Sequence, residues 1–98
     1  MKITSFYYLA YPDSLPLDPF VAASEVYIEV SETEGSINDF DFSYSIHVYT
    51  VGFIQQQAKE KSFFCTRPAI VVDRFDDSSI KVALEAILPK IHQIAERK

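Results

Sequence analysis

The chain has 98 residues, a length that fits one small domain and leaves no room for a second. Hydrophobic residues make up 48% of it and glycine occurs only twice, so the composition predicts a folded domain and excludes a disordered chain. The net charge of −5 is concentrated in residues 1–50, which carry eight acids against Lys2 alone, and such a half would repel nucleic acid and an anionic membrane surface.

The first half of the chain predicts three strands. Residues 2–10 are rich in β-branched and aromatic side chains and predict a strand that ends at the proline-containing loop YPDSLPLDP, where Asp18 could begin one helical turn. Apolar and polar side chains alternate over residues 25–31 and again over residues 36–50, which hold the longest alternation in the sequence. An acidic, glycine-containing turn separates these two segments, so they are expected to form a hairpin.

The second half predicts two helices with a strand between them. Thr50 could cap a short helix over VGFIQQQAKEK, and residues 67–73 contain the apolar run AIVV, which predicts a strand buried on both faces. A last helix follows, capped by Asp76 or Asp77, with an apolar stripe that Pro89 must kink or interrupt. Together the elements predict a single α+β domain: a mainly antiparallel sheet of about four strands, with the long C-terminal helix and the short helix packed on one face.

The alternation of the hairpin gives its two faces different compositions. The even-numbered side chains are apolar and are expected to lie under the C-terminal helix, which leaves the odd-numbered ones on an open surface. A solvated face would explain acids there, but tyrosines between acids of a single sign favour a surface that binds a basic protein. The predicted binding residues are Glu25, Tyr27, Glu29, Asp39, Asp41, His47 and Tyr49, with Glu32 and Glu34 in the turn.

Sequence motifs for catalysis or metal binding are missing. Glycine at positions 35 and 52 alone allows no phosphate-binding loop and no nucleophile elbow, and no Cys or His spacing fits a zinc site. Asp73, Asp76 and Asp77 could hold Mg²⁺ or Ca²⁺, but capping of the last helix is the favoured interpretation. We therefore expect no metal and no cofactor.

The two histidines do not form a recognisable catalytic arrangement either. His47 could act as a base near Asp41 or Tyr49, and His92 could pair with Glu96 four residues later on the last helix. Neither adjoins a recognisable nucleophile or oxyanion site, so surface or packing roles are favoured and the protein is expected not to be an enzyme.

Cysteine usage and hydropathy bear on the cellular compartment. Cys65 is the one cysteine, so no internal disulfide can form. The N-terminal residues MKITSFYYLAYP do not fit a signal peptide, and no apolar run is long enough to cross a bilayer. These features predict a cytoplasmic protein.

Two segments carry a resemblance to a known family. EVYIEVSETEGSINDFDFSYSIHVYT, followed after a short helix by AIVVDRFDDSSIKVALEAIL, resembles the immunity protein 8 family, small bacterial antitoxins of polymorphic-toxin and contact-dependent growth inhibition systems. The shared pattern covers roughly residues 25–88, and Phe40, Phe42 and the VVDRFD stretch are its most specific parts. The family often has a proline and a tryptophan after the third strand, where this chain has TVGF.

The resemblance implies a non-enzymatic inhibitor of one cognate toxin domain, and it carries over no binding residue. Many such toxins are nucleases with basic active sites, which an acidic surface could cover. We therefore expect a protein that is monomeric when free and forms a 1:1 complex with a basic toxin domain.

Two other functions are compatible with the sequence. An acidic secretion chaperone or adaptor is the first, and it would bind a client segment as a dimer. A small hydrolase or ligand-binding domain is the second, and it would need an enclosed pocket joining His47 or Cys65 to carboxylates.

Overall fold

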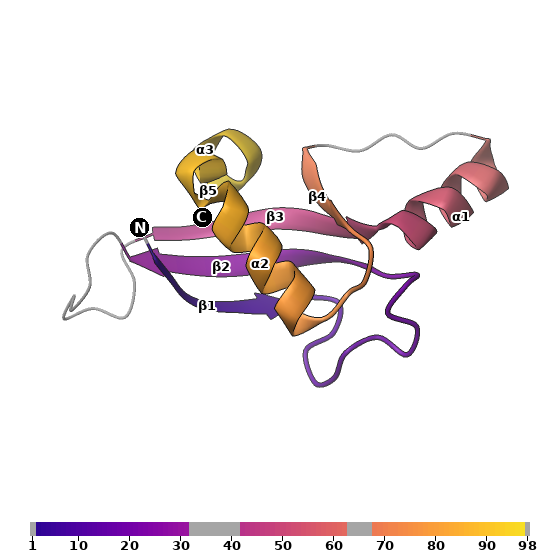
Figure 1. The fold of residues 1–98 in the computed structure, drawn as a ribbon, viewed down its shortest axis with the longest axis horizontal. Helices are drawn as coiled ribbons and strands as arrows, with labels where there is room; N and C mark the ends of the chain where they lie inside the picture. The colour runs from indigo at the N-terminus through magenta and orange to yellow at the C-terminus, as the bar shows by residue number, and fades with distance from the viewer. Residues whose placement is uncertain (1, 32–41, 63–67, 98) are drawn as a thin grey trace.

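The computed structural model describes residues 2–31, 42–62 and 68–97, which form one sheet with the C-terminal helices on one face (Figure 1). This arrangement confirms the predicted α+β class and the mainly antiparallel sheet. In chain order the elements are β1 (Lys2–Tyr8), β2 (Ala23–Ser31), β3 (Phe42–Thr50), α1 (Val51–Lys61), β4 (Ala69–Val72), α2 (Asp77–Ile87), the 3-10 turn η1 (Leu88–Lys90), α3 (Ile91–Ile94) and β5 (Glu96–Arg97).

The strand order is β1-β2-β3-β4, and β5 also pairs with β3. The predicted hairpin is confirmed, because β2 and β3 are antiparallel from Val30 opposite Phe42 to Ala23 opposite Tyr49. β4 runs parallel to the second half of β3, whereas β5 pairs with its first half. Two short strands therefore share one edge of β3, an arrangement that the sequence did not predict.

The hydrophobic core lies between the sheet and the C-terminal helices. Figure 1 shows α2 crossing over the sheet, and the apolar side chains beneath it are fully or almost fully buried. Even-numbered residues supply them, as predicted, and each contributes about 1.5–3 kcal/mol by burial. The buried set includes Val26, Ile28, Val30, Ile46, Val48, Ile70 and Val72 of the strands, with Phe75, Ile80, Leu84 and Ile91 above them.

Two predictions about the second half need adjustment. The prediction that AIVV is buried on both faces is wrong, since Ile70 and Val72 are buried but Val71 is 52% exposed. The reason is that α2 covers one face of β4 and no described element covers the other. The prediction that the short helix packs on the same face of the sheet also needs adjustment. α1 contains no buried residue, and Figure 1 shows it extending beyond the end of the sheet.

The helix ends follow the predicted cap chemistry. Thr50 caps α1, because its hydroxyl oxygen accepts a hydrogen bond from the Phe53 amide at 3.1 Å. Asp76 caps α2 by accepting from the Ser79 amide at 2.8 Å, and this bond lowers the pKa of its carboxyl. Pro89 interrupts the helical stripe, since α2 ends at Ile87 and η1 carries the proline before α3 begins.

Other polar contacts tie the loops and strands to this frame. Asp18 begins only a turn, in which its carboxylate accepts from the Phe20 amide at 3.0 Å. The Tyr8 hydroxyl donates to Asp77 at 2.5 Å, which joins β1 to α2, and burial followed by this bond raises the pKa of Tyr8. Among the helices within the described ranges, none combines the length and the apolar character that a membrane span requires.

Candidate functional site: the open face of the sheet

The sheet face opposite α2 is not covered by any element that the structure describes, and we call it the open face. The strand register assigns side chains to it, because residues that oppose each other across two strands point to the same side. Tyr7 opposes Tyr27, Glu25 opposes His47, and Ser45 opposes both Tyr27 and Glu96. The open face includes Ser5, Tyr7, Glu25, Tyr27, Glu29, Ser45, His47, Tyr49, Val71 and Glu96.

Five of the nine predicted binding residues lie together on this face. They are all half-buried, so each keeps part of its side chain accessible to a partner. The five are Glu25, Tyr27, Glu29, His47 and Tyr49. The other four, Glu32, Glu34, Asp39 and Asp41, lie outside the described residues.

Aromatic rings on the open face contact one another across and along the strands. The rings of Tyr7 and Tyr27 meet edge to face with centroids 5.3 Å apart. Tyr49 stacks between His47, at 6.2 Å, and Phe53 of α1, at 5.6 Å. Rings held in this way present large rigid areas at little conformational cost, which is the property of aromatic anchors in protein interfaces.

The carboxylates of the open face are separated by these rings and strands. Glu29 accepts a hydrogen bond from the Ser5 hydroxyl at 2.8 Å, which fixes it near the β1 edge. Glu25 opposes His47 but forms no ion pair within the part of the chain that the structure describes. Among the described strand residues, Lys2 is the one base that the register assigns to this face, opposite Ser31. The described residues of this face therefore carry more acids than bases.

Glu96 is an open-face carboxylate that sequence reasoning missed. The sequence predicted that it would share the last helix with His92, but α3 ends at Ile94 and Ala95 has an extended backbone. Glu96 then pairs with Ser45 in β5, so it lies beyond the last helix and not one helical turn after His92. A two-residue strand has no periodic pattern, so no local signal could have revealed it. Tyr7 was also missed, although the apolar pattern of β1 could have pointed to it.

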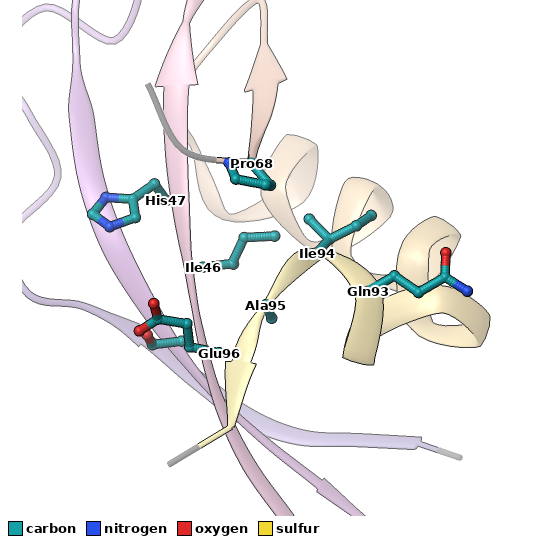
Figure 2. A pocket seen from close by; sticks show the side chains of 8 residues that line it. Ile46, His47, Pro68, Gln93, Ile94, Ala95 and Glu96 are labelled. Carbon is teal, nitrogen blue, oxygen red and sulfur yellow. The ribbon is translucent and has the colours of Figure 1, made fainter. Parts of the chain in front are cut away.

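A small pocket opens beside the open face, on the edge of β3 between β4 and β5. Its volume is about 220 Å³. Figure 2 shows His47 and Glu96 extending to one side of β3, whereas Ile46 and Ile94 lie on the other. The lining residues are Ser45, Ile46, His47, Pro68, Gln93, Ile94, Ala95 and Glu96.

The pocket joins a histidine to a carboxylate, which is the feature that a small hydrolase would need. Within the described residues, however, no hydrogen bond connects the Ser45 hydroxyl to His47, so this serine lacks the adjacent base that activates a nucleophile. Asp73, Asp76 and Asp77 do not form a metal site, and no group of three or more potential ligands occurs within 2–31, 42–62 and 68–97.

Comparison with known proteins gives no relative for this chain. No family model, no curated protein and no solved structure matches it. The chemistry of the open face therefore carries the functional conclusion.

Proposed function

We propose that this protein is an immunity protein that neutralises a cognate toxin domain by covering a basic active site with its open face. One observation supports this most directly: carboxylates and tyrosines share a sheet face that the described helices leave uncovered. The resemblance to the immunity protein 8 family, whose most specific parts here are Phe40, Phe42 and the VVDRFD stretch, supports the same function.

The partner that fits this surface is a basic protein, and a nuclease domain is the proposed class. A nuclease must hold phosphate groups and so carries clustered Lys and Arg at its active site. Glu25, Glu29 and Glu96 would occupy the positions that substrate phosphates take, and charge-assisted hydrogen bonds to Arg or Lys would replace those to phosphate. Binding in the cytoplasm of the producing cell would protect that cell.

Charge and aromatic contacts would contribute differently to such a complex. Long-range attraction could raise the association rate to about 10⁸ M⁻¹s⁻¹ at low salt. A stable interface would bury about 1,200–2,000 Å² in total. Affinity would depend mainly on Tyr27 and Tyr49 as anchors, because aromatic side chains at the centre of an interface dominate binding energy.

The first test is co-purification with the product of the neighbouring gene. A basic toxin domain should remain bound at about 50 mM salt and associate measurably more slowly at about 500 mM salt, since screening weakens attraction between exposed charges. Light scattering of the free protein should give a monomer. A dimer that holds an unfolded client would instead support the chaperone alternative.

Charge reversal on the open face gives a sharper test. The double variant Glu25→Lys/Glu29→Lys should slow association at low salt by about 10-fold or more. Its matched control, Glu60→Lys/Glu85→Lys, changes the net charge equally at exposed positions on α1 and α2 and should slow association much less. Equal slowing by both doubles, or none by either, would show that the open face does not meet the toxin.

A further inference from the structure

We propose that the outer edge of β4 pairs with an extended segment of the basic partner, which adds a strand to the sheet and carries apolar side chains with Lys or Arg beside them. This inference rests on the proposed function and deepens it, because it names a backbone contact that the partner makes beside the open face. The segment belongs to the toxin domain, and a second copy of this chain is the alternative that the test excludes.

The backbone of β4 is paired on one side only. β4 runs parallel to β3 from Ala69, opposite His47, to Val72, opposite Thr50, and it is the last strand of the sheet order (Figure 1). No other described strand pairs with it. In a strand, alternate residues direct their N–H and C=O groups to each edge, so β4 leaves such groups at its outer edge. An extended backbone matches them, since it presents complementary groups at the same spacing.

The two edges of the sheet differ in how they are protected. β1, the edge strand on the opposite side, carries Lys2 and has a register shift between Ile3 and Ser5. A charge and an irregularity of this kind hinder the addition of another strand. β4 has the sequence AIVV, without a charge, and its register with β3 is regular. The β4 edge is therefore the one that favours strand addition.

A shallow hollow beside this edge fits the side chains of an added strand. Its volume is about 440 Å³, and it is lined by the end of β4 and the first turns of α2. Val72 and Val82 are its apolar residues, and Val82 is 68% exposed. On the other face of β4, Val71 is 52% exposed. An added strand would cover both Val71 and Val82, because its successive side chains point to opposite faces of the sheet.

The charge of the hollow favours a basic segment over an acidic one. Asp73 follows β4 directly and is the one charged residue among the described residues that line the hollow. It is exposed, and no described residue forms an ion pair with it. Arg74, the next residue, pairs with Asp76 at 3.1 Å. Lys or Arg in the added strand would therefore be attracted to this end of β4, and Asp or Glu would be repelled.

The length of β4 decides between the two possible occupants. Its four residues form too short an edge to hold a dimer of this chain, since a stable interface buries about 1,200–2,000 Å² in total. A toxin domain on the open face would supply most of that area by itself. Val71 belongs to the open face, so a toxin segment that follows β4 extends the same interface without a break.

A peptide titration of the free protein tests the proposal without the toxin. The probe is acetyl-Lys-Val-Thr-Val-Lys-amide. Its control carries N-methyl groups on the valines and the threonine, which removes their hydrogen-bond donors and leaves the charge and the side chains unchanged. Nuclear magnetic resonance should show saturable shifts of the backbone amides of Ile70, Val71 and Val72 with the probe. The methylated peptide should bind about 10-fold more weakly or worse, because its backbone hydrogen bonds are lost.

Two variants of α2 with the same change in charge complete the test. Val82→Lys places a cation in the hollow and should weaken binding of the probe by about 10-fold. Ala86→Lys, at an exposed position that does not line the hollow, should change it by less than about 2-fold. Equal binding of the two peptides, equal effects of the two variants, or equally large shifts at the β1 edge would overturn the proposal. A dimer of the free protein that Val82→Lys abolishes would also overturn it, because a second copy would then occupy the edge.

This outcome is separate from that of the charge-reversal experiment on the open face. If the probe does not bind at β4 while Glu25→Lys/Glu29→Lys still slows association with the toxin, only the strand-addition proposal fails. If the probe binds at β4 while that double variant associates at an unchanged rate, the proposed function fails and the β4 edge remains a site for extended basic segments.

Discussion

The two faces of the hairpin come from the same alternating sequence and differ in what covers them. On the covered face, Ile28 and Ile46 are shielded from water by α2 and its neighbours. On the open face, Tyr27 and His47, each one residue away, stay half-buried. This difference means that the residues that determine stability and the residues that determine binding can be separated within a single pair of strands. Substitutions on the covered face should change the free energy of unfolding, and those on the open face should change affinity for a partner.

The largest effect is expected at the centre of the covered face. Leu84 of α2 is fully buried, so Leu84→Ala should lower the free energy of unfolding by about 2–5 kcal/mol through lost burial and a residual cavity. Urea unfolding followed by circular dichroism measures this. Val82→Ala on the same helix is the control, because Val82 is 68% exposed and its truncation should cost less than about 0.5 kcal/mol. Similar losses in both variants would mean that α2 does not cover the sheet.

The matching experiment on the open face is truncation of an anchor. Tyr27→Ala should weaken binding to the toxin domain by about 2 kcal/mol, or roughly 30-fold, because a rigid ring leaves the interface. Its unfolding free energy should change much less than that of Leu84→Ala, since Tyr27 is only half-buried and its ring packs edge to face on Tyr7, itself 49% exposed. Calorimetric titration and urea unfolding of the same variant separate the two quantities. A large loss of stability with unchanged affinity would reverse the assignment of this face.

Thr50 differs from the other buried strand residues discussed above because it is polar, and it is fully buried. Its hydroxyl oxygen caps α1 and also accepts from the Ala22 amide at 3.0 Å, so one side chain joins β3, α1 and the loop before β2. Thr50→Val keeps the shape but leaves buried amides unpaired, and it should cost about 1–2 kcal/mol of stability. Thr50→Ser retains the hydroxyl and should recover most of that loss in the same unfolding assay.

Local patterns allowed the covered face and the helix ends to be predicted. The hairpin follows from alternation over residues 25–31 and 36–50, and the caps at Thr50 and Asp76 follow from side chains that accept backbone hydrogen bonds. These signals lie within a few residues of the structure they specify. They can therefore be recognised without knowledge of the rest of the chain.

The parts that the sequence did not reveal depend on distant contacts. Burial of AIVV on both faces was a wrong prediction, because an apolar run does not say whether a second layer will cover it, and Val71 is left exposed here. Glu96 reaches the open face only because β5 pairs with Ser45, about fifty positions earlier in the chain. The pocket at Ile46 results from the meeting of β4 and β5 on one edge, which no local pattern encodes.

The smallest expected effect is on the pH dependence of stability, and it concerns Asp76, an acid that caps a helix and does not lie on the open face. Asp76 accepts from the Ser79 amide at the start of α2, and this bond lowers its pKa below the ordinary value, with a smaller contribution from Arg74 at 3.1 Å. A carboxyl whose pKa is lower in the folded protein stabilises the fold above its unfolded-state pKa, and this contribution is lost as the pH falls through the folded-state value.

Acid unfolding of charge-neutral variants measures that contribution. Below about pH 4, protonation of Asp76 should remove its stabilising contribution from the native protein. The variant Asp76→Asn, whose side chain can still cap the helix, carries no charge there and has no such contribution to lose. The stability of this variant should therefore fall less steeply between neutral and acid pH in urea unfolding. Asp73→Asn removes the same charge at an exposed position three residues earlier and should keep the full acid dependence. Identical pH profiles for both variants would show that the cap of α2 does not depend on the charge of Asp76.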